Sequence, residues 1–223
     1  AATSAAALDK MAPPRTARLA VLGSGLEAKM HTRAFAAVRD FSEIVVFSPT
    51  PASRERFASE IGTELGVRTI AAASAEEAVM SADVVLAAAR SHGERPILFG
   101  DWIMPGAVTV SIGSTIPQQR EIDVSVVRQS DTIVCDMLHE VVGETGDMIA
   151  AAQAGVELGG KCFSLNDLMS GALAQRLAAA RYPMFKSVGG GLQDVVVAGM
   201  ILDRALEAGI ATELPISFVS KHV

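Results

Sequence analysis

Short apolar runs alternate with helical patterns of apolar and polar positions along most of the chain. Runs of strand length, most of them rich in β-branched residues, occur at Leu19–Leu22, Ile44–Phe47, Val84–Ala88, Val108–Ile112 and Thr132–Cys135, with a weaker one at Thr69–Ala71. Helical patterns occur at Leu26–Val38, Ala52–Leu65, Ala75–Met80, Val124–Gln129 and Gly146–Gln153. Continuously apolar strands that alternate with helices are typical of a parallel sheet covered on both faces. We therefore predict an α/β fold with a doubly wound, mostly parallel sheet.

The alternation of strand and helix patterns becomes less regular after Gly155. A short helix around Ala172–Ala180, a strand-like segment at Met184–Ser187 and a long helix near Leu192–Ala208 are predicted there. The chain starts with a helix-forming sequence, Ala1–Met11, that has no capping residue before it. We expect the chain to be a fragment of a longer protein, and its last segment to pack on the sheet or on a partner domain.

Composition and charge exclude several classes of protein. Half of the 223 residues are hydrophobic (50%), which excludes a disordered chain. The 25 acidic residues outnumber the 19 basic ones, and the net charge of -6 disfavours nucleic acid as a partner. Charged residues interrupt every apolar run well before the ~18 residues that a membrane-spanning helix needs. Cys135 and Cys162 stand alone, which indicates neither a disulfide framework nor a zinc site, so we expect a soluble protein of the reducing cytoplasm without a metal.

The strongest local motif lies between the first predicted strand and the helix after it. Gly23-Ser24-Gly25-Leu26-Glu27-Ala28 has the GxGxxA spacing of a dinucleotide fingerprint. Gly23 permits the tight turn, Gly25 lets the backbone approach a pyrophosphate, and the helix N-terminus presents amide donors to it. A turn that merely needs glycine is the less favoured alternative, and a P-loop is excluded because Met30 follows Lys29. The motif predicts a Rossmann-like, dinucleotide-binding domain.

The end of the second strand indicates which ribose is bound. An acid there accepts a hydrogen bond from a free 2′-hydroxyl, whereas small polar and basic residues admit a 2′-phosphate. The segment here is Phe47-Ser48-Pro49-Thr50, without a carboxylate, and Arg54 and Arg56 follow it. The sequence therefore favours NADP over NAD, unless the two arginines are ordinary solvated helix residues.

Polar residues also follow the strands at Val108–Ile112 and Thr132–Cys135. Ser111 to Pro117 is expected in the crevice at the carboxyl ends of the strands, as a loop under a nicotinamide. Glu121 and Asp123 are interpreted as acids in the first turn of the next helix, where they suit its dipole. Asp136 either faces the crevice or caps the following loop.

The four histidines show no metal-ligand spacing. His31, His92, His139 and His222 are each interpreted as surface or packing residues, although His92 and His139 follow strand ends and so lie near the predicted crevice. The three glycines 189–191 let the backbone approach a flat ligand or form a hinge.

These sequence segments, taken together, resemble those of the ornithine cyclodeaminase and mu-crystallin superfamily of NAD(P)-dependent enzymes. The matching segments are Gly23 to Ala28 with His31, Arg95 to Leu98, Ser111 to Ser114, Pro117, Arg120 to Asp123, Asp131 to Asp136, Glu144 to Asp147, Phe185 to Gly189, and Gln193-Asp194. They run in the family's order across nearly the whole chain.

The resemblance implies a domain organisation. In that family a separate N-terminal domain supplies a substrate-binding arginine and lysine and forms the dimer, and this chain is expected to start just after it. Residues 1–17 would then be a helix and linker from the truncated domain, and residues 18–160 the NAD(P)-binding Rossmann domain. Residues 161–223 would complete the site and return a C-terminal helix toward the missing domain, and the protein would be a homodimer.

The resemblance also implies site residues. Leu26 and Glu27 would lie on the pyrophosphate, Ser48 at the ribose, Ala89 beside the cofactor, and Ser187 with Val188 against nicotinamide and substrate. The expected cofactor-binding residues are Gly23, Ser24, Gly25, Leu26, Glu27, Ser48, Thr50, Arg54, Ala89, Gly113, Gln119 and Ser187. Val188 is the expected substrate contact and Thr115 the expected catalytic residue. Lys186 has a weaker claim as a cation for the substrate carboxylate, because its side chain is expected to point away from the crevice.

One departure from the family pattern bears on the reaction. Cyclodeaminases of the family carry an aspartate proton donor where this chain has Thr115, and a lysine where it has Gln119. A threonine hydroxyl is no substitute for a carboxylic acid near neutral pH. The resemblance therefore implies hydride transfer at the α-carbon of an amino acid or cyclic ketimine. The alternatives are an ammonia-releasing ornithine cyclodeaminase that forms proline, a non-catalytic protein that binds a small ligand with NADP, and, less favoured because Ser48 is not an acid, a methyltransferase.

Overall fold

The protein folds around one parallel sheet. The computed structural model describes residues 1–89 and 95–215. Within them an eight-stranded sheet has the order β3-β2-β1-β4-β5-β8-β6-β7, and all pairs are parallel. The strands are β1 (Arg18–Leu22), β2 (Glu43–Phe47), β3 (Arg68–Ala71), β4 (Val84–Ala87), β5 (Val108–Ser111), β6 (Thr132–Cys135), β7 (Cys162–Ser164) and β8 (Pro183–Lys186). The predicted α/β, doubly wound parallel fold is confirmed.

The strand order reverses next to β1. The chain runs from β1 outward through β2 to β3, and then crosses back to place β4 on the other side of β1. Leu19 consequently pairs in register with Ile44 on one side and Val84 on the other. Loops at the carboxyl ends of β1 and β4 leave in opposite directions at such a point, which opens a crevice there.

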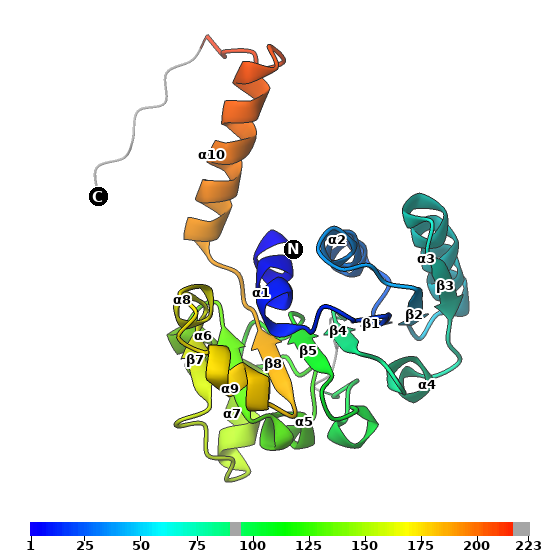
Figure 1. Ribbon diagram of the computed structural model, residues 1–223, viewed down its shortest axis with the longest axis vertical. Helices are drawn as coiled ribbons and strands as arrows, with labels where there is room; N and C mark the ends of the chain where they lie inside the picture. The colour runs from blue at the N-terminus through cyan, green and yellow to red at the C-terminus, as the bar shows by residue number, and fades with distance from the viewer. Residues whose placement is uncertain (90–94, 216–223) are drawn as a thin grey trace. The chain divides into compact units, whose positions relative to one another are not determined.

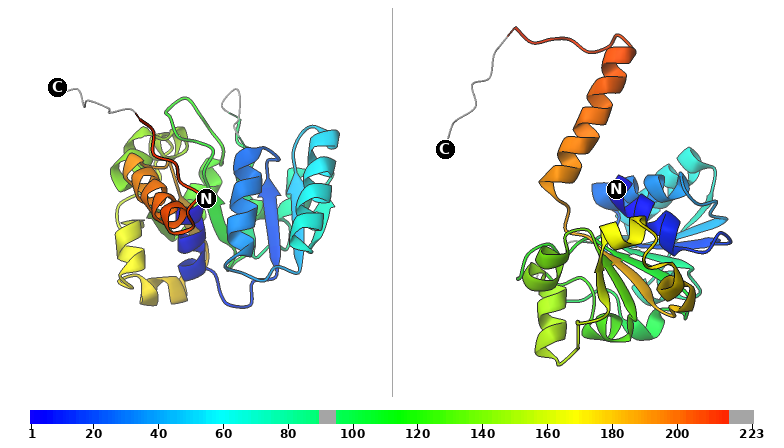
Figure 2. Two further views of the ribbon diagram at one scale, coloured as in Figure 1. Left: turned by 90° about the horizontal axis from the view of Figure 1, so that it is seen from above. Right: turned by 60° about the vertical axis from the view of Figure 1, so that its left-hand side comes forward.

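Helices cover both faces of the sheet (Figures 1 and 2). On one face lie α1 (Ala2–Met11), α2 (Leu26–Ala36), α3 (Pro51–Leu65) and α8 (Leu165–Met169), with α9 (Ala174–Ala179) beside them. On the other face lie α4 (Ala75–Val79), α5 (Val124–Gln129), α6 (Leu138–Glu144), α7 (Gly146–Gln153) and a short 3-10 helix, Gly100–Trp102. Two hydrophobic clusters, one on each face, therefore form the core.

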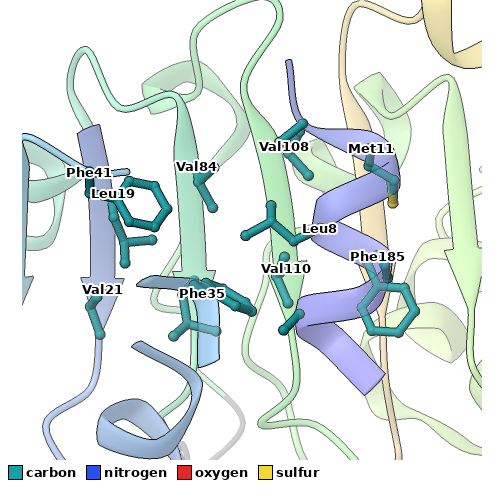
Figure 3. Packing of buried hydrophobic residues seen from close by; sticks show 14 of the residues in the cluster. Leu8, Met11, Leu19, Val21, Phe35, Phe41, Val84, Val108, Val110 and Phe185 are labelled. Atoms are coloured by element: carbon teal, nitrogen blue, oxygen red, sulfur yellow. The ribbon is translucent and has the colours of Figure 1, made fainter. Parts of the chain in front are cut away.

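Helix α1 is part of this core. Leu8 of α1 is fully buried against β5 and β8, where Val110 and Phe185 belong to the same cluster (Figure 3). Phe35 of α2 is also fully buried in the cluster. The apolar positions of the first predicted helix are therefore explained by packing on the sheet.

Four elements of the described residues were not expected from the sequence, one of them the 3-10 helix Gly100–Trp102. β7, α6 and α8 have three, seven and five residues, and each is too short to give a clear periodic signal. The predicted strand at Met184–Ser187 is β8, and it inserts between β5 and β6. The predicted helix around Ala172–Ala180 is α9 with its preceding turn.

Contacts divide the chain after Val188. Ala1–Val188 is one compact unit, and the chain from Gly189 onward is another, in which α10 (Gly191–Glu207) has no buried residue. The boundaries at residues 17 and 160, and the return of the last helix toward a further domain, stay predictions. None of the helices in the described residues is long and apolar enough to cross a membrane.

Candidate functional site

The two glycines of the fingerprint have different roles. Gly23 has a left-handed φ of +119°, and a Cβ added there would lie 2.5 Å from the carbonyl oxygen of Ala88, so the fold itself requires this glycine. Gly25 has a φ of −79° and is exposed, and no heavy atom lies within 4 Å of the place of its missing Cβ. The protein does not need a glycine at position 25. The bare backbone there leaves room for a ligand to approach.

The residues after Gly25 form an open helix N-terminus. Gly25 is the N-cap of the eleven-residue α2, and no side chain caps this end. Leu26 in the first turn is 72% exposed, and Glu27 beside it is exposed too. Unpaired amides at a helix N-terminus bind anions. An open glycine turn, free amides and an uncovered apolar side chain together fit the pyrophosphate of a dinucleotide.

The carboxyl end of β2 carries hydroxyls and a guanidinium. The Ser24 hydroxyl lies 3.0 Å from the buried Ser48 hydroxyl, and Arg54 Nη1 donates to the Ser48 carbonyl at 2.9 Å. The Arg54 guanidinium also stacks on the Phe47 ring at 5.5 Å. Thr50, the N-cap residue of α3, is exposed. The Arg54 side chain therefore lies against the end of β2 and is not the ordinary solvated helix residue that was the alternative interpretation.

The loop after β5 brings Thr115 and Gln119 together. Gln119 Oε1 accepts hydrogen bonds from the Thr115 amide at 3.2 Å and the Thr115 hydroxyl at 3.3 Å. The Ser114 hydroxyl donates to the Gln119 carbonyl at 2.7 Å and closes the base of the loop. Thr115 and Ile116 are exposed, the latter at 46%. The loop therefore presents a hydroxyl, a side-chain amide and an apolar side chain at the edge of the sheet, without a carboxylic acid at Thr115.

Glu121 corrects the sequence interpretation. It is not an acid in the first turn of a helix, because it is fully buried and its carboxylate accepts from the Ala89 amide at 2.9 Å, the Gly113 amide at 2.9 Å and the Ser111 hydroxyl at 2.8 Å. A Cβ on Gly113 would lie 2.2 Å from Glu121 Oε1. Glu121 therefore fixes the ends of β4 and β5. Asp123 is not in the first turn either: it is the N-cap residue of α5, one position before the helix, and its carboxylate accepts from the Ser125 amide at 2.8 Å.

Lys186 is unavailable for a substrate. Its side chain is fully buried, pairs with Asp147 at 3.0 Å, and donates to the Ser111 hydroxyl at 3.0 Å and the Ser114 carbonyl at 3.2 Å. Burial raises the pKa of the Glu121 carboxyl, and the positive charge of Lys186 opposes this rise. Lys186 thus joins β8 to the loop after β5 and to α7.

Ser187 and Val188 are held by one carboxylate at the end of β6. Asp136 accepts from the Ser187 hydroxyl at 2.7 Å, the Val188 amide at 3.1 Å and the Met137 amide at 2.8 Å. Asp136 therefore caps its own loop and anchors the neighbouring one. The glycines 189–191 follow in the second compact unit.

The histidines of the described residues are not grouped into a site. His31 is buried between α1 and α2, and His139 is exposed on α6, as packing and surface residues should be. His92 and His222 lie outside the described residues. No group of three or more metal-ligating side chains occurs in the part of the chain that the structure describes.

The fold and the fingerprint define a Rossmann-like domain, and comparison with known proteins identifies its family. A sequence profile of the ornithine cyclodeaminase/mu-crystallin family matches residues 1–209. The chain belongs to this family.

Three relatives illustrate the similarity. The chain is 31% identical over 204 residues to the ketimine reductase mu-crystallin of Mus musculus, covering 91% of this chain and 60% of the relative. It is 33% identical to an NAD(P)H-dependent anabolic L-arginine dehydrogenase of Pseudomonas aeruginosa, covering 94% and 64%. The solved structure of Thermococcus litoralis Delta(1)-pyrroline-2-carboxylate reductase, in complex with NADH and L-proline, superposes with a TM-score of 0.88 at 28% identity, covering 96% and 66%. The chain thus spans 60% to 64% of the length of these two curated relatives.

Proposed function

We propose that the protein is an NAD(P)-dependent oxidoreductase that moves a hydride between a nicotinamide cofactor and the α-carbon of an amino acid or cyclic ketimine. The names of the relatives support this reaction class, since they describe a ketimine reductase, an L-arginine dehydrogenase and a pyrroline carboxylate reductase. The bound cofactor would supply the carbon that gives or takes the hydride. The chain's own residues bind and orient it.

One observation carries the cofactor proposal: the empty space above Gly25. Nothing in the protein occupies the place of a Cβ at Gly25. The backbone conformation of Gly25 is one that other residue types adopt without strain. A glycine that the fold does not need, at an uncapped helix N-terminus, is explained by close contact with a pyrophosphate.

The proposed contacts divide the cofactor into three parts. The pyrophosphate would lie on Gly23, Ser24, Gly25, Leu26 and Glu27, the adenine-side ribose on Ser48, Thr50 and Arg54, and the nicotinamide side on Ala89, Gly113, Gln119, Ser187 and Val188. The first two sets lie at the ends of β1 and β2, and the third lies at the ends of β4, β5 and β8. The hydroxyls and the guanidinium at the ribose position support NADP as the cofactor.

Thr115 supports a reductase over a cyclodeaminase. Its hydroxyl already donates to Gln119, and neither residue can serve as a carboxylic acid. A hydroxyl at this place can orient a substrate without releasing a proton near neutral pH.

The test is nucleotide binding by Gly25→Val. The branched side chain should occupy the open space and lower the affinity for NADPH at least tenfold, while the fold remains intact. Gly159→Val is the matched control, because Gly159 is also exposed with nothing within 4 Å of its missing Cβ and lies before β7, at the opposite edge of the sheet. Fluorescence titration that gives one affinity for wild type and Gly25→Val would show the proposal to be wrong.

Assembly and location belong to the same proposal. We infer a homodimer through a separate N-terminal domain, as the family resemblance implies, and the exposed apolar side chains of α10, among them Leu192, Ile201 and Leu206, offer a surface that such a domain could cover. The free thiols of Cys135 and Cys162 support a reducing compartment such as the cytoplasm. Analytical ultracentrifugation of the purified protein tests the homodimer.

A further inference from the structure

Asp136 lies where two neighbouring strands end. β6 and β8 are paired in register up to Cys135 and Lys186, so Asp136 and Ser187 are the first residues beyond the strands. Asp136 Oδ2 accepts the Ser187 hydroxyl at 2.7 Å, and Oδ1 accepts the amides of Val188 at 3.1 Å and Met137 at 2.8 Å. Both carboxylate oxygens are therefore used to hold the protein's own groups.

This arrangement determines whether the Ser187 hydroxyl can donate or accept a hydrogen bond toward a ligand. A carboxylate only accepts hydrogen bonds, so the single proton of the Ser187 hydroxyl is committed to Asp136. The Ser187 amide donates to the Ser111 carbonyl at 3.0 Å, so it is committed too. Ser187 is partly exposed, and what its side chain still offers to a ligand are the lone pairs of Oγ.

We propose that Asp136 is a positioning residue that makes Ser187 a hydrogen-bond acceptor for an N–H group of the bound ligand. The inference rests on the proposed function, which supplies two such groups: the carboxamide of nicotinamide and the nitrogen of the amino acid or of the protonated imine. Asp136 acts through Ser187 and Val188, because its own oxygens are occupied. An acceptor at this place favours a ligand that donates and disfavours one that only accepts.

The conservative variant Asp136→Asn reverses the polarity of the bond to Ser187. An asparagine carbonyl oxygen in the place of Oδ1 keeps the bonds from Val188 and Met137. Its amide nitrogen in the place of Oδ2 donates to Ser187, whose hydroxyl proton is then free to point at the ligand. The variant therefore turns Ser187 from an acceptor into a donor.

The same strand pair offers a matched control at its other end. Asp131, just before β6, accepts from the amides of Arg181 at 2.6 Å and Tyr182 at 3.3 Å, just before β8. Asp131→Ala removes the bonds from these two amides to the Asp131 carboxylate, at the amino ends of the same two strands. It should lower the melting temperature and leave ligand binding within about twofold of wild type.

The experiment compares NADPH with the reduced 3-acetylpyridine analogue of the same cofactor. The analogue keeps the carbonyl acceptor of the carboxamide and lacks its N–H donor. Wild type should bind NADPH up to about tenfold more tightly, the upper end of what one neutral hydrogen bond contributes. Asp136→Asn and Ser187→Ala should both abolish this preference, which would identify the carboxamide as the donor.

The remaining outcomes are equally decisive. A cofactor preference that survives in both variants, together with about a tenfold rise in both in the dissociation constant of the imine, titrated into the cofactor-loaded chain, supports the proposal with the substrate nitrogen as the donor. Unchanged constants in Asp136→Asn, or equal changes in Asp131→Ala, overturn it in favour of a structural role. Failure of wild type to bind either nicotinamide cofactor overturns the proposed function as well, and the Gly25→Val titration detects that failure independently.

Discussion

Single residues at the carboxyl edge of the sheet are expected to determine which nicotinamide cofactor fits. Ser48 is buried beside Ser24, and Arg54 is held against its carbonyl oxygen. A carboxylate at position 48 would repel a 2′-phosphate and accept from a free 2′-hydroxyl. The side chain at this one position is therefore expected to decide between the two nicotinamide cofactors.

We predict that wild type binds NADPH more tightly than NADH and that Ser48→Asp reverses the order, each by about tenfold or more. Titration with both cofactors measures the ratio. Ser42→Asp is the control, because Ser42 precedes the same strand at its amino end and is exposed. Tighter binding of NADH by wild type would contradict the prediction.

His31 makes the stability of the protein depend on pH. Its Nδ1 lies 2.8 Å from the Glu27 carbonyl oxygen, which only accepts, so Nδ1 carries the proton and Nε2 accepts from the Ser4 hydroxyl at 3.2 Å. Burial lowers the pKa of His31. A lowered pKa means that the folded state favours the neutral ring, so this stabilisation is present above the ordinary pKa of about 6.5 and is lost as the pH falls toward the folded value.

We predict that the melting temperature of wild type falls more between pH 7.5 and 5 than that of His31→Gln. The glutamine does not titrate, so the contribution of His31 to the pH dependence of stability is absent in this variant. His139→Gln, at an exposed position, should keep the steeper wild-type dependence. Parallel curves for wild type and His31→Gln would refute this.

The residue scale also shows what a sequence reveals about a site. The turn at Gly23 and Gly25 was predictable because it depends only on local sequence between a strand and a helix. Glu121 and Lys186 were not, because a charged side chain in a sequence is normally a surface residue. Their burial depends on Asp147 and on strand ends that are distant in the chain, and single-sequence patterns carry no such information.

At the scale of elements, one buried ion pair joins β8 to α7. Lys186 and Asp147 are both 0% exposed, and Asp147 Oδ1 also accepts the amides of Glu121 at 2.8 Å and Ile122 at 3.2 Å. Removing Asp147 leaves the buried Lys186 charge without its ion-pair partner, and removing Lys186 leaves Asp147 with only the Arg120 guanidinium, whose Nε lies 3.5 Å away. Either single loss is more costly than removing both partners.

Lys186→Met is therefore expected to lower the free energy of unfolding by about 3–5 kcal/mol. The double variant Lys186→Met with Asp147→Asn should lose less than the sum of the two single variants. Urea unfolding of all three measures this coupling. Lys29→Met is a control for an ion pair at the surface, with Glu60, and should change little. Additive losses in the double variant would contradict the proposed dependence of one charge on the other.

The same scale explains which elements could be predicted. β1, β2, β4, β5 and β6 were predictable, since each is a continuous apolar run in a sheet covered on both faces. The position of β8 between β5 and β6 was not predictable. After β6 the chain forms two helices, a strand and two more helices before it returns to the sheet as β8. Strand order depends on long-range pairing, for which hydrophobic periodicity gives no signal.

For the whole molecule, cofactor binding and catalysis have different requirements. The proposed cofactor contacts all lie within the compact unit Ala1–Val188. A substrate carboxylate is normally held by a cationic side chain through charge-assisted hydrogen bonds. Lys186, the cation that the sequence offered for this purpose, is fully buried and paired with Asp147. We therefore expect this chain to bind the cofactor without catalysing the reaction.

The prediction is that the 223-residue chain binds NADPH and leaves cyclic ketimines unreduced, because the hydride donor would be in place while Lys186 stays paired with Asp147 and does not hold the substrate near it. NADPH absorbance with a panel of cyclic imines, and ammonia release from ornithine, measure turnover in this chain and in any longer natural form that contains it. Imine reduction by the 223-residue chain would show that its own residues suffice for the substrate. Stoichiometric ammonia and proline from ornithine, with no net change in NADPH, would favour a cyclodeaminase despite Thr115, since only that reaction returns the hydride to its product.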